Sequence, residues 1–106
     1  MPFQSVTPRP FTPLGIRSIA PADGGVYGIS NAREWIYIGE SDNIQRSLME
    51  HLAGSEATLE NWSPTGFVYE VCGQAIRASR QDRLVLEYEP ACNRLSPGHR
   101  RNGSQQ

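Results

Sequence analysis

Lysine is absent from this 106-residue chain, and its ten basic residues are all arginine. Without a lysine, the chain can neither form a Schiff base with a substrate nor supply a P-loop lysine to a nucleotide phosphate. No apolar run approaches the roughly 20 residues that a membrane-spanning helix needs. The first thirteen residues contain four prolines and no apolar segment, unlike a signal peptide. These absences predict a single cytoplasmic domain without membrane association.

Cysteine and histidine are also scarce, with two residues of each type. Cys72 and Cys92 lie twenty positions apart without a CxxC motif, and His51 and His99 stand at no spacing typical of zinc ligands. A disulfide is not expected in a reducing cytosol. We therefore interpret both cysteines as structural thiols.

Positive charge is sparse in the body of the chain. The net charge is −1, but residues 94–106 contain three arginines and no acidic residue. Residues 1–93 therefore have seven arginines against eleven acidic residues, a net charge of −4. Such a body lacks the broad basic surface typical of DNA-binding domains. With only the arginines of the tail available for phosphate contacts, binding to nucleic acid would depend weakly on salt.

Composition divides the chain into three parts. Residues 1–20 are a Pro-rich lead-in that we expect to be partly ordered, and residues 21–93 form the domain. Residues 94–106 are an Arg-containing tail, rich in serine, glycine and glutamine, that we expect to be disordered.

Two short runs of β-branched and aromatic residues, 26–30 and 35–39, predict a β-hairpin joined by the turn 31–34. Alternation along the second strand assigns its side chains to two faces, with Trp35, Tyr37 and Gly39 on one and Ile36 and Ile38 on the other.

A helix is predicted after the hairpin. Asp42 can cap its N-terminus, with Gln45 at the third helical position, an arrangement similar to a capping box. Apolar residues recur at four-residue intervals from Ile44 to Leu52, and Gly54 ends the helix.

The remaining pattern predicts a short helical turn and a Pro-Gly loop in residues 55–66, a third strand in 66–71, and a helix in 74–89 that Pro90 stops. The order β-β-α-(α)-β-α describes a small α/β (α+β) domain. We expect a three-stranded, mostly antiparallel sheet flanked by helices.

Two tripeptides of the predicted hairpin, Gly25-Val26-Tyr27 and Tyr37-Ile38-Gly39, stand about ten residues apart. Asn43 and His51 follow at the start and the end of the predicted helix. This pattern resembles the GIY-YIG nuclease superfamily, which includes phage-type homing endonucleases and the nuclease domain of bacterial excision repair. In such a family, the glycines keep the strand backbone close to the helix and the substrate.

The end of the domain adds to the resemblance, because the helix over residues 74–89 leads through Pro90 to Asn93, as the family's last helix leads to an asparagine. The resemblance covers about residues 24–93, two-thirds of the chain. It implies the hydrolysis of DNA phosphodiester bonds with one Mg²⁺ or Mn²⁺ ion as the cofactor.

The resemblance also assigns roles to individual side chains. Tyr27 and Tyr37 match the two tyrosines that activate or orient the attacking water. His51 matches a position that is often histidine or tyrosine, and Asn93 matches the terminal asparagine. Each also has a structural alternative, as a strand aromatic, a histidine at a helix C-terminus or the cap of a turn.

Two catalytic positions depart from the family. Its arginine, which stabilises charge on the phosphate, falls on Ser47, and its metal-binding glutamate falls on Gln81, whose amide is a poor ligand for a hard cation. Arg46 and Asp82 are adjacent, but one step along a helix rotates a side chain by about 100°. Glu40, where the family often has lysine, adds negative charge.

Asn43, Ser47 and His51 lie at four-residue intervals and therefore share one face of the predicted helix. Arg46 lies on another face, where it can pair with Glu50, or its long side chain can curl back into the site. The sequence leaves both alternatives open.

The residues support three functional hypotheses. In the first, the domain has lost most or all nuclease activity and binds nucleic acid or a protein partner. Its former cleft would be lined by Tyr27, Tyr37, Ser47, His51 and Asn93. In the second, it is a weak endonuclease that uses Mg²⁺ or Mn²⁺. In the third, it is a scaffold that binds only protein, which an exposed apolar patch around Trp35 or Trp62 would favour.

Overall fold

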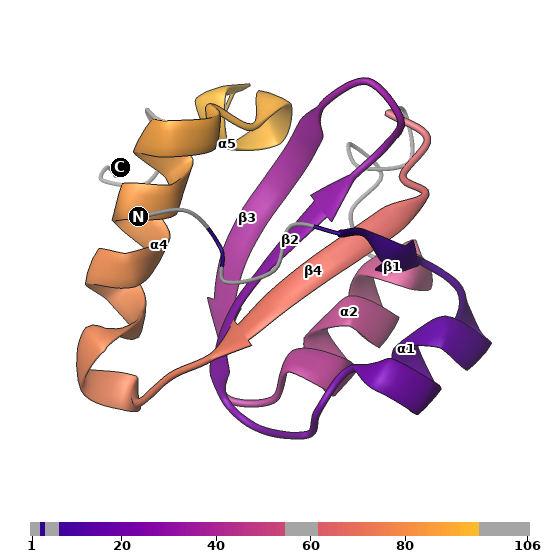
Figure 1. Cartoon of the computed structure of the whole chain (residues 1–106), viewed down its shortest axis with the longest axis horizontal. Coiled ribbons are helices and arrows are strands. Elements are labelled where there is room, and N and C mark those ends of the chain that lie inside the picture. Colours follow the sequence, from indigo (N-terminus) through magenta and orange to yellow (C-terminus); the bar gives the residue numbers. More distant parts are fainter. Residues whose placement is uncertain (1–2, 4–6, 55–61, 96–106) are drawn as a thin grey trace.

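A computed structural model describes residue 3 and residues 7–54 and 62–95 of the chain. Within them, a four-stranded antiparallel sheet has the order β1-β4-β2-β3, and helices cover both of its faces (Figure 1). The strands are β1 (Arg9–Pro10), β2 (Gly25–Ser30), β3 (Trp35–Ser41) and β4 (Gly66–Val71). The helices are α1 (Pro13–Ile19), α2 (Ile44–Leu52), α4 (Gln74–Tyr88) and α5 (Ala91–Leu95). The predicted α+β class is confirmed.

The sheet has four strands rather than the predicted three, because part of the Pro-rich lead-in joins it. Arg9 pairs with Phe67 and Pro10 with Gly66, so β1 extends the sheet beyond β4. The helix α1 follows directly, and its N-cap Thr12 accepts a hydrogen bond from a backbone N–H of the first turn. A two-residue strand has no alternation for a pattern to detect, so the sequence did not predict it.

The helix α2 begins one residue later than predicted, with Asn43 rather than Asp42 as its N-cap. The Asn43 side chain accepts a hydrogen bond from the Arg46 N–H at 2.9 Å. Asp42 instead forms an ion pair of 2.6 Å with Arg77 of α4. The predicted capping box of Asp42 and Gln45 is therefore wrong, because a tertiary contact uses the aspartate.

A β-bulge in the hairpin changes the faces of two side chains. The register of β2 and β3 shifts after the pair formed by Ile29 and Tyr37. Trp35 therefore packs in the same apolar cluster as Ile38, while Ile36 packs in that of Tyr37. Simple alternation predicted the reverse for both Trp35 and Ile36. It was wrong because a bulge inserts one residue and reverses the alternation beyond it.

Two apolar clusters hold the helices to the sheet. The cluster on the α1 and α2 side consists of Phe11, Ile16, Ala20, Tyr27, Ile29, Ile36, Ile44, Leu48, Phe67 and Cys92. The cluster on the α4 side consists of Phe3, Val26, Ile38, Val68 and Leu84. Both cysteines are free thiols. Within the part of the chain that the structure describes, no helix is long and apolar enough to cross a membrane.

The last two helices position the residues near the end of the domain. α4 agrees with the predicted helix to within one residue and ends at Tyr88, with Glu89 as its C-cap in a left-handed conformation (φ of 50°). Pro90 then separates α4 from the short helix α5, which carries Asn93. The predicted helical turn in residues 55–66 lies mostly outside the described residues.

An ion pair fixes α4 on the sheet. Arg80 of α4 donates two hydrogen bonds to the Glu70 carboxylate of β4, at 2.7 and 2.8 Å. The two side chains are only 13% and 10% exposed, and the hydrogen bond to Glu70 raises the pKa of Arg80. Gln81, the next residue of α4, contacts the sheet separately, through a hydrogen bond from its Nε2 to the Ile38 carbonyl oxygen.

Candidate functional site

Tyr27, Tyr37 and His51 come together between the hairpin and α2, and we call these three residues the tyrosine site. Their ring centroids lie 6.2 Å apart for the tyrosine pair, 5.7 Å for Tyr27 and His51, and 5.3 Å for Tyr37 and His51. The Tyr27 hydroxyl and His51 Nε2 share a hydrogen bond of 2.8 Å. Tyr27 is buried, whereas Tyr37 and His51 are partly exposed and form the accessible side of the site.

The two motif glycines are needed for different physical reasons. A Cβ at Gly39 would lie 2.7 Å from the Tyr27 hydroxyl and 2.8 Å from a ring carbon of Tyr37, so Gly39 leaves space for both rings. A Cβ at Gly25 would lie 2.2 Å from the backbone carbonyl oxygen of Glu70. Gly25 therefore allows β2 and β4 to approach each other.

Ser47, at which the sequence resemblance expects an arginine, has its side chain hydrogen-bonded to the end of β3. The Ser47 and Ser41 hydroxyl oxygens lie 2.6 Å apart. Ser41 also accepts a hydrogen bond from the Asn43 N–H at 2.9 Å and donates one to the Asn43 carbonyl at 2.8 Å. These contacts join α2 to the sheet, and Arg46 lies exposed on the surface of α2.

Gln81 and Asn93 both bind the backbone of Ile38 in β3. The Ile38 N–H donates to Asn93 Oδ1 at 2.7 Å. The Ile38 carbonyl accepts from Asn93 Nδ2 at 3.0 Å and from Gln81 Nε2 at 3.1 Å. Because β3 is an edge strand, these amides satisfy backbone groups that no further strand reaches. They hold β3 in place at Ile38, the residue between Tyr37 and Gly39 and therefore next to the tyrosine site.

We expect Asn93→Ala to lower the free energy of unfolding by about 2–3 kcal/mol, because it leaves the buried Ile38 N–H without its acceptor. Gln81→Ala is the matched control, since the Ile38 carbonyl keeps the Asn93 donor, and it should cost about 1 kcal/mol or less. Urea denaturation followed by circular dichroism measures both. Equal losses for the two variants would contradict this assignment.

Sequence reasoning missed Ser41, which links Ser47 and Asn43 to the end of β3. The signal was a serine two residues before the helix cap, a position where a hydroxyl commonly bonds to nearby backbone. Cys72, close to the start of α4, has no place in the site. Burial, together with the negative charge of Glu70, raises the pKa of its thiol and makes it less reactive.

Comparison with known proteins identifies the fold. No protein-family model and no curated protein matches the sequence. The structure, however, is similar to the GIY-YIG N-terminal endonuclease domain of UvrC from Thermotoga maritima. The magnesium-bound domain has a TM-score of 0.62 and 22% identity, over 72% of this chain and 92% of that chain. A tyrosine-to-phenylalanine variant of that domain has a TM-score of 0.62 and 21% identity, again over 72% of this chain and 92% of that chain. The chain thus has a GIY-YIG-like fold, as its motifs predicted.

The UvrC structures carry a catalytic divalent cation. Gln81, at which the sequence resemblance expects a metal-binding glutamate, has its amide nitrogen facing the Ile38 carbonyl oxygen. A hard cation prefers carboxylate oxygen to such a group. Across residues 3, 7–54 and 62–95, no group of three or more histidine, cysteine, aspartate or glutamate side chains could hold an ion.

Proposed function

We propose that this domain binds nucleic acid at the tyrosine site without hydrolysing it. The proposal depends on one observation: the side chains of Ser47 and Gln81, where the resemblance expects an arginine and a glutamate, are both hydrogen-bonded to β3. Neither provides the positive charge or the carboxylate that hydrolysis uses. Loss of one group that stabilises the transition state typically lowers the rate by about 10²–10³.

Nucleic acid is favoured over a protein partner by the combination of fold and side chains. The similar solved domains are endonuclease domains. Tyr37 and His51 offer aromatic faces and polar groups, which suit the stacking and hydrogen bonding of nucleotides. A protein partner alone would leave this cluster of rings and its Tyr27–His51 hydrogen bond without a function.

An active endonuclease that uses Mg²⁺ or Mn²⁺ is the second candidate, and the retained hydrogen bond between Tyr27 and His51 favours it. Such an enzyme would need Arg46 and Asp82 to supply the missing charges. Both are exposed, and each is one step along its helix from the required position. We therefore rank this function below binding without hydrolysis.

The test is binding and cleavage of duplex, branched and single-stranded DNA by the wild-type chain. We expect no cleavage with Mg²⁺ or Mn²⁺, and binding that EDTA leaves unchanged. If the arginines of residues 94–106 make two or three phosphate contacts, the slope of log K against log salt concentration should be about −2. Fluorescence anisotropy and gel analysis of the same samples measure both properties.

His51→Ala and Tyr37→Ala should weaken this binding, whereas Arg46→Ala, at an exposed position of the same helix, should not. Cation-dependent cleavage that Tyr27→Phe abolishes would establish the second candidate instead. Binding to none of the three DNA forms would refute the proposal.

A further inference from the structure

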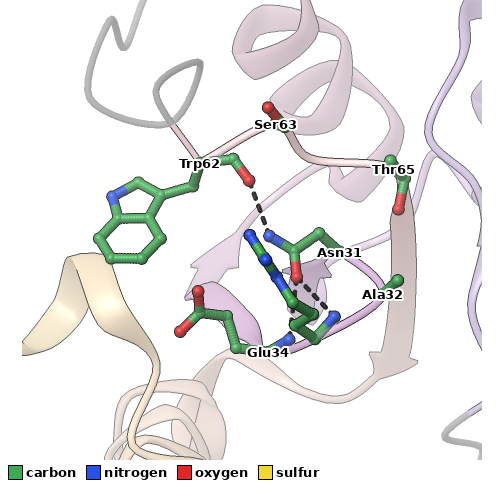
Figure 2. Close-up of a pocket in the computed structure, with 7 residues that line it drawn as sticks. Asn31, Ala32, Glu34, Trp62, Ser63 and Thr65 are labelled. Carbon is green, nitrogen blue, oxygen red and sulfur yellow. Dashed lines mark hydrogen bonds between the residues drawn. The ribbon is translucent and has the colours of Figure 1, made fainter.

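A cavity of about 420 Å³ lies at the tip of the hairpin, outside the tyrosine site. Its volume lies within the range of about 300–1,000 Å³ that small-ligand pockets occupy. Figure 2 shows the turn between β2 and β3 on one side of it and the segment before β4 on the other. The cavity is lined by Asn31, Ala32, Arg33, Glu34, Trp62, Ser63 and Thr65.

Asn31 holds the two sides of this cavity together. Its Oδ1 accepts hydrogen bonds from the N–H groups of Arg33 at 2.8 Å and Glu34 at 2.9 Å. Its Nδ2 donates to the carbonyl oxygen of Trp62 at 2.7 Å, across to the other segment (Figure 2). The Thr65 N–H donates to the carbonyl oxygen of Ser30 at 2.9 Å. A cavity organised in this way loses little conformational entropy when a ligand binds.

The walls combine an aromatic ring with two groups of opposite charge. The half-buried Trp62 indole and the Glu34 side chain extend into the same space from different segments (Figure 2). Arg33, between Asn31 and Glu34, is exposed and adds a positive charge at the rim. A planar ring can stack on the indole, while the carboxylate accepts hydrogen bonds from ring amino groups.

The cavity and the tyrosine site lie along the same apolar cluster of the sheet. Trp62 packs against the same apolar cluster as Tyr37, on the α2 side of the sheet. Along β3, Tyr37 is only two residues from Trp35, where the strand begins. Because Tyr37 and Trp62 pack against the same side of the sheet, one extended single strand can follow this side and contact both.

We propose that this cavity binds one unpaired base of a single-stranded nucleic acid, an inference that rests on the proposed function. The base stacks on Trp62, Glu34 accepts a hydrogen bond from an exocyclic amino group, and Arg33 contacts an adjacent phosphate. In a duplex the faces of the bases are stacked on one another, so the cavity selects single strands. Acidic side chains characteristically accept from the amino group of cytosine. Thymine has no amino group, so the cavity discriminates against it.

The experiment compares oligo(dC) with oligo(dT) by intrinsic fluorescence in a Trp35→Phe variant, which leaves Trp62 as the only tryptophan. We expect quenching on binding, and tighter binding of oligo(dC). Loss of a base stack worth about 1–3 kcal/mol corresponds to a five- to 150-fold weaker affinity. Trp62→Ala, assayed by anisotropy, should bind oligo(dC) at least about five-fold more weakly than the wild type. Trp62→Phe should retain most of the affinity.

Further variants separate the role of each side chain. Glu34→Gln should bring the oligo(dC) to oligo(dT) affinity ratio close to one, because an amide can also donate to thymine oxygen atoms. Leu86→Ala, an exposed and uncharged position of α4 outside the cavity, should change neither affinity nor ratio. Thermal melting of each variant identifies any that fails to fold, and Trp62→Phe then tests the stack by itself.

The outcomes distinguish this inference from the proposed function. Binding that Tyr37→Ala abolishes and Trp62→Ala leaves intact would overturn the inference and keep the function. Preference for duplex DNA would likewise overturn the inference alone. Cleavage of single strands that depends on Trp62 would keep the inference and overturn the proposal of binding without hydrolysis. No binding to any oligonucleotide would overturn both.

Discussion

The double variant Ser47→Arg/Gln81→Glu is expected to cleave DNA in the presence of Mg²⁺ or Mn²⁺, at a rate at least about 10³-fold above the wild type. The variant introduces a positive charge on α2 and a carboxylate on α4, the two groups that the sequence resemblance expects at these positions. The hydrogen bond between Tyr27 and His51 is already in place. A gel assay with a supercoiled plasmid and with single strands measures the rate.

The packing around both positions explains why the fold should tolerate this change. Ser47→Arg gives up a hydrogen bond to Ser41, and Gln81→Glu removes one of the two donors to the Ile38 carbonyl. That carbonyl keeps Asn93 Nδ2, so no backbone group of β3 loses its last partner. The cost should be about 1–2 kcal/mol of stability.

Two controls accompany the double variant. Each single variant should remain close to the wild type, because either change leaves the other catalytic position unfilled. Tyr27→Phe in the double variant should abolish the new activity. A double variant that folds and binds DNA but cuts no faster than the wild type would show that the tyrosine site does not have a nuclease arrangement.

Gly25→Ala is expected to have the largest effect on stability among the glycine variants, a loss of about 3 kcal/mol or more. The new methyl group would lie 2.2 Å from the Glu70 carbonyl oxygen, and backbone in the middle of a sheet cannot move aside as a side chain can. Separation of β2 from β4 would also displace Tyr27 from His51. Urea denaturation gives the loss, and the tyrosine and histidine NMR signals report the displacement.

Gly39→Ala and Gly73→Ala complete a graded series. The contacts at Gly39 are with tyrosine rings, which can shift, so we expect a smaller loss of about 1–2 kcal/mol. A methyl group at Gly73 would meet no atom within 4 Å, and the residue has a φ of −69°, so alanine should change stability by less than about 0.5 kcal/mol. Similar losses at Gly25 and Gly73 would show that steric contact does not explain the first.

The elements that could be predicted from the sequence are those with a strong local pattern of apolar residues. The hairpin, α2 and α4 follow from runs of β-branched residues and from apolar residues at helical spacing. The bulge that turns Trp35 toward Ile38 has no such local pattern, because pairing with a neighbouring strand produces it. For the same reason, Asp42 was assigned to a helix cap although Arg77, 35 residues away in the sequence, forms an ion pair with it.

In the candidate site, too, local spacing predicted some features, and others depend on contacts between separate elements. The two motifs and the helical spacing predicted that Tyr27, Tyr37 and His51 belong together, and the structure places their rings within 6.2 Å of one another. Spacing also led to the hypothesis that Ser47 and Gln81 replace a catalytic arginine and glutamate. It could not show that these side chains bond to Ser41 and Ile38, since those contacts join separate elements.

The sequence by itself determined most of the elements and the two motifs that bring Tyr27, Tyr37 and His51 together, because both depend on local order and spacing. Only the tertiary structure decided what the neighbouring polar side chains do. Gln81 and Asn93 satisfy an edge strand that they meet only after α4 and α5 have packed on the sheet. The cavity at the hairpin tip likewise exists because one asparagine joins two segments about 30 residues apart. Such contacts follow from chain folding, which brings distant residues together in ways that local spacing does not specify.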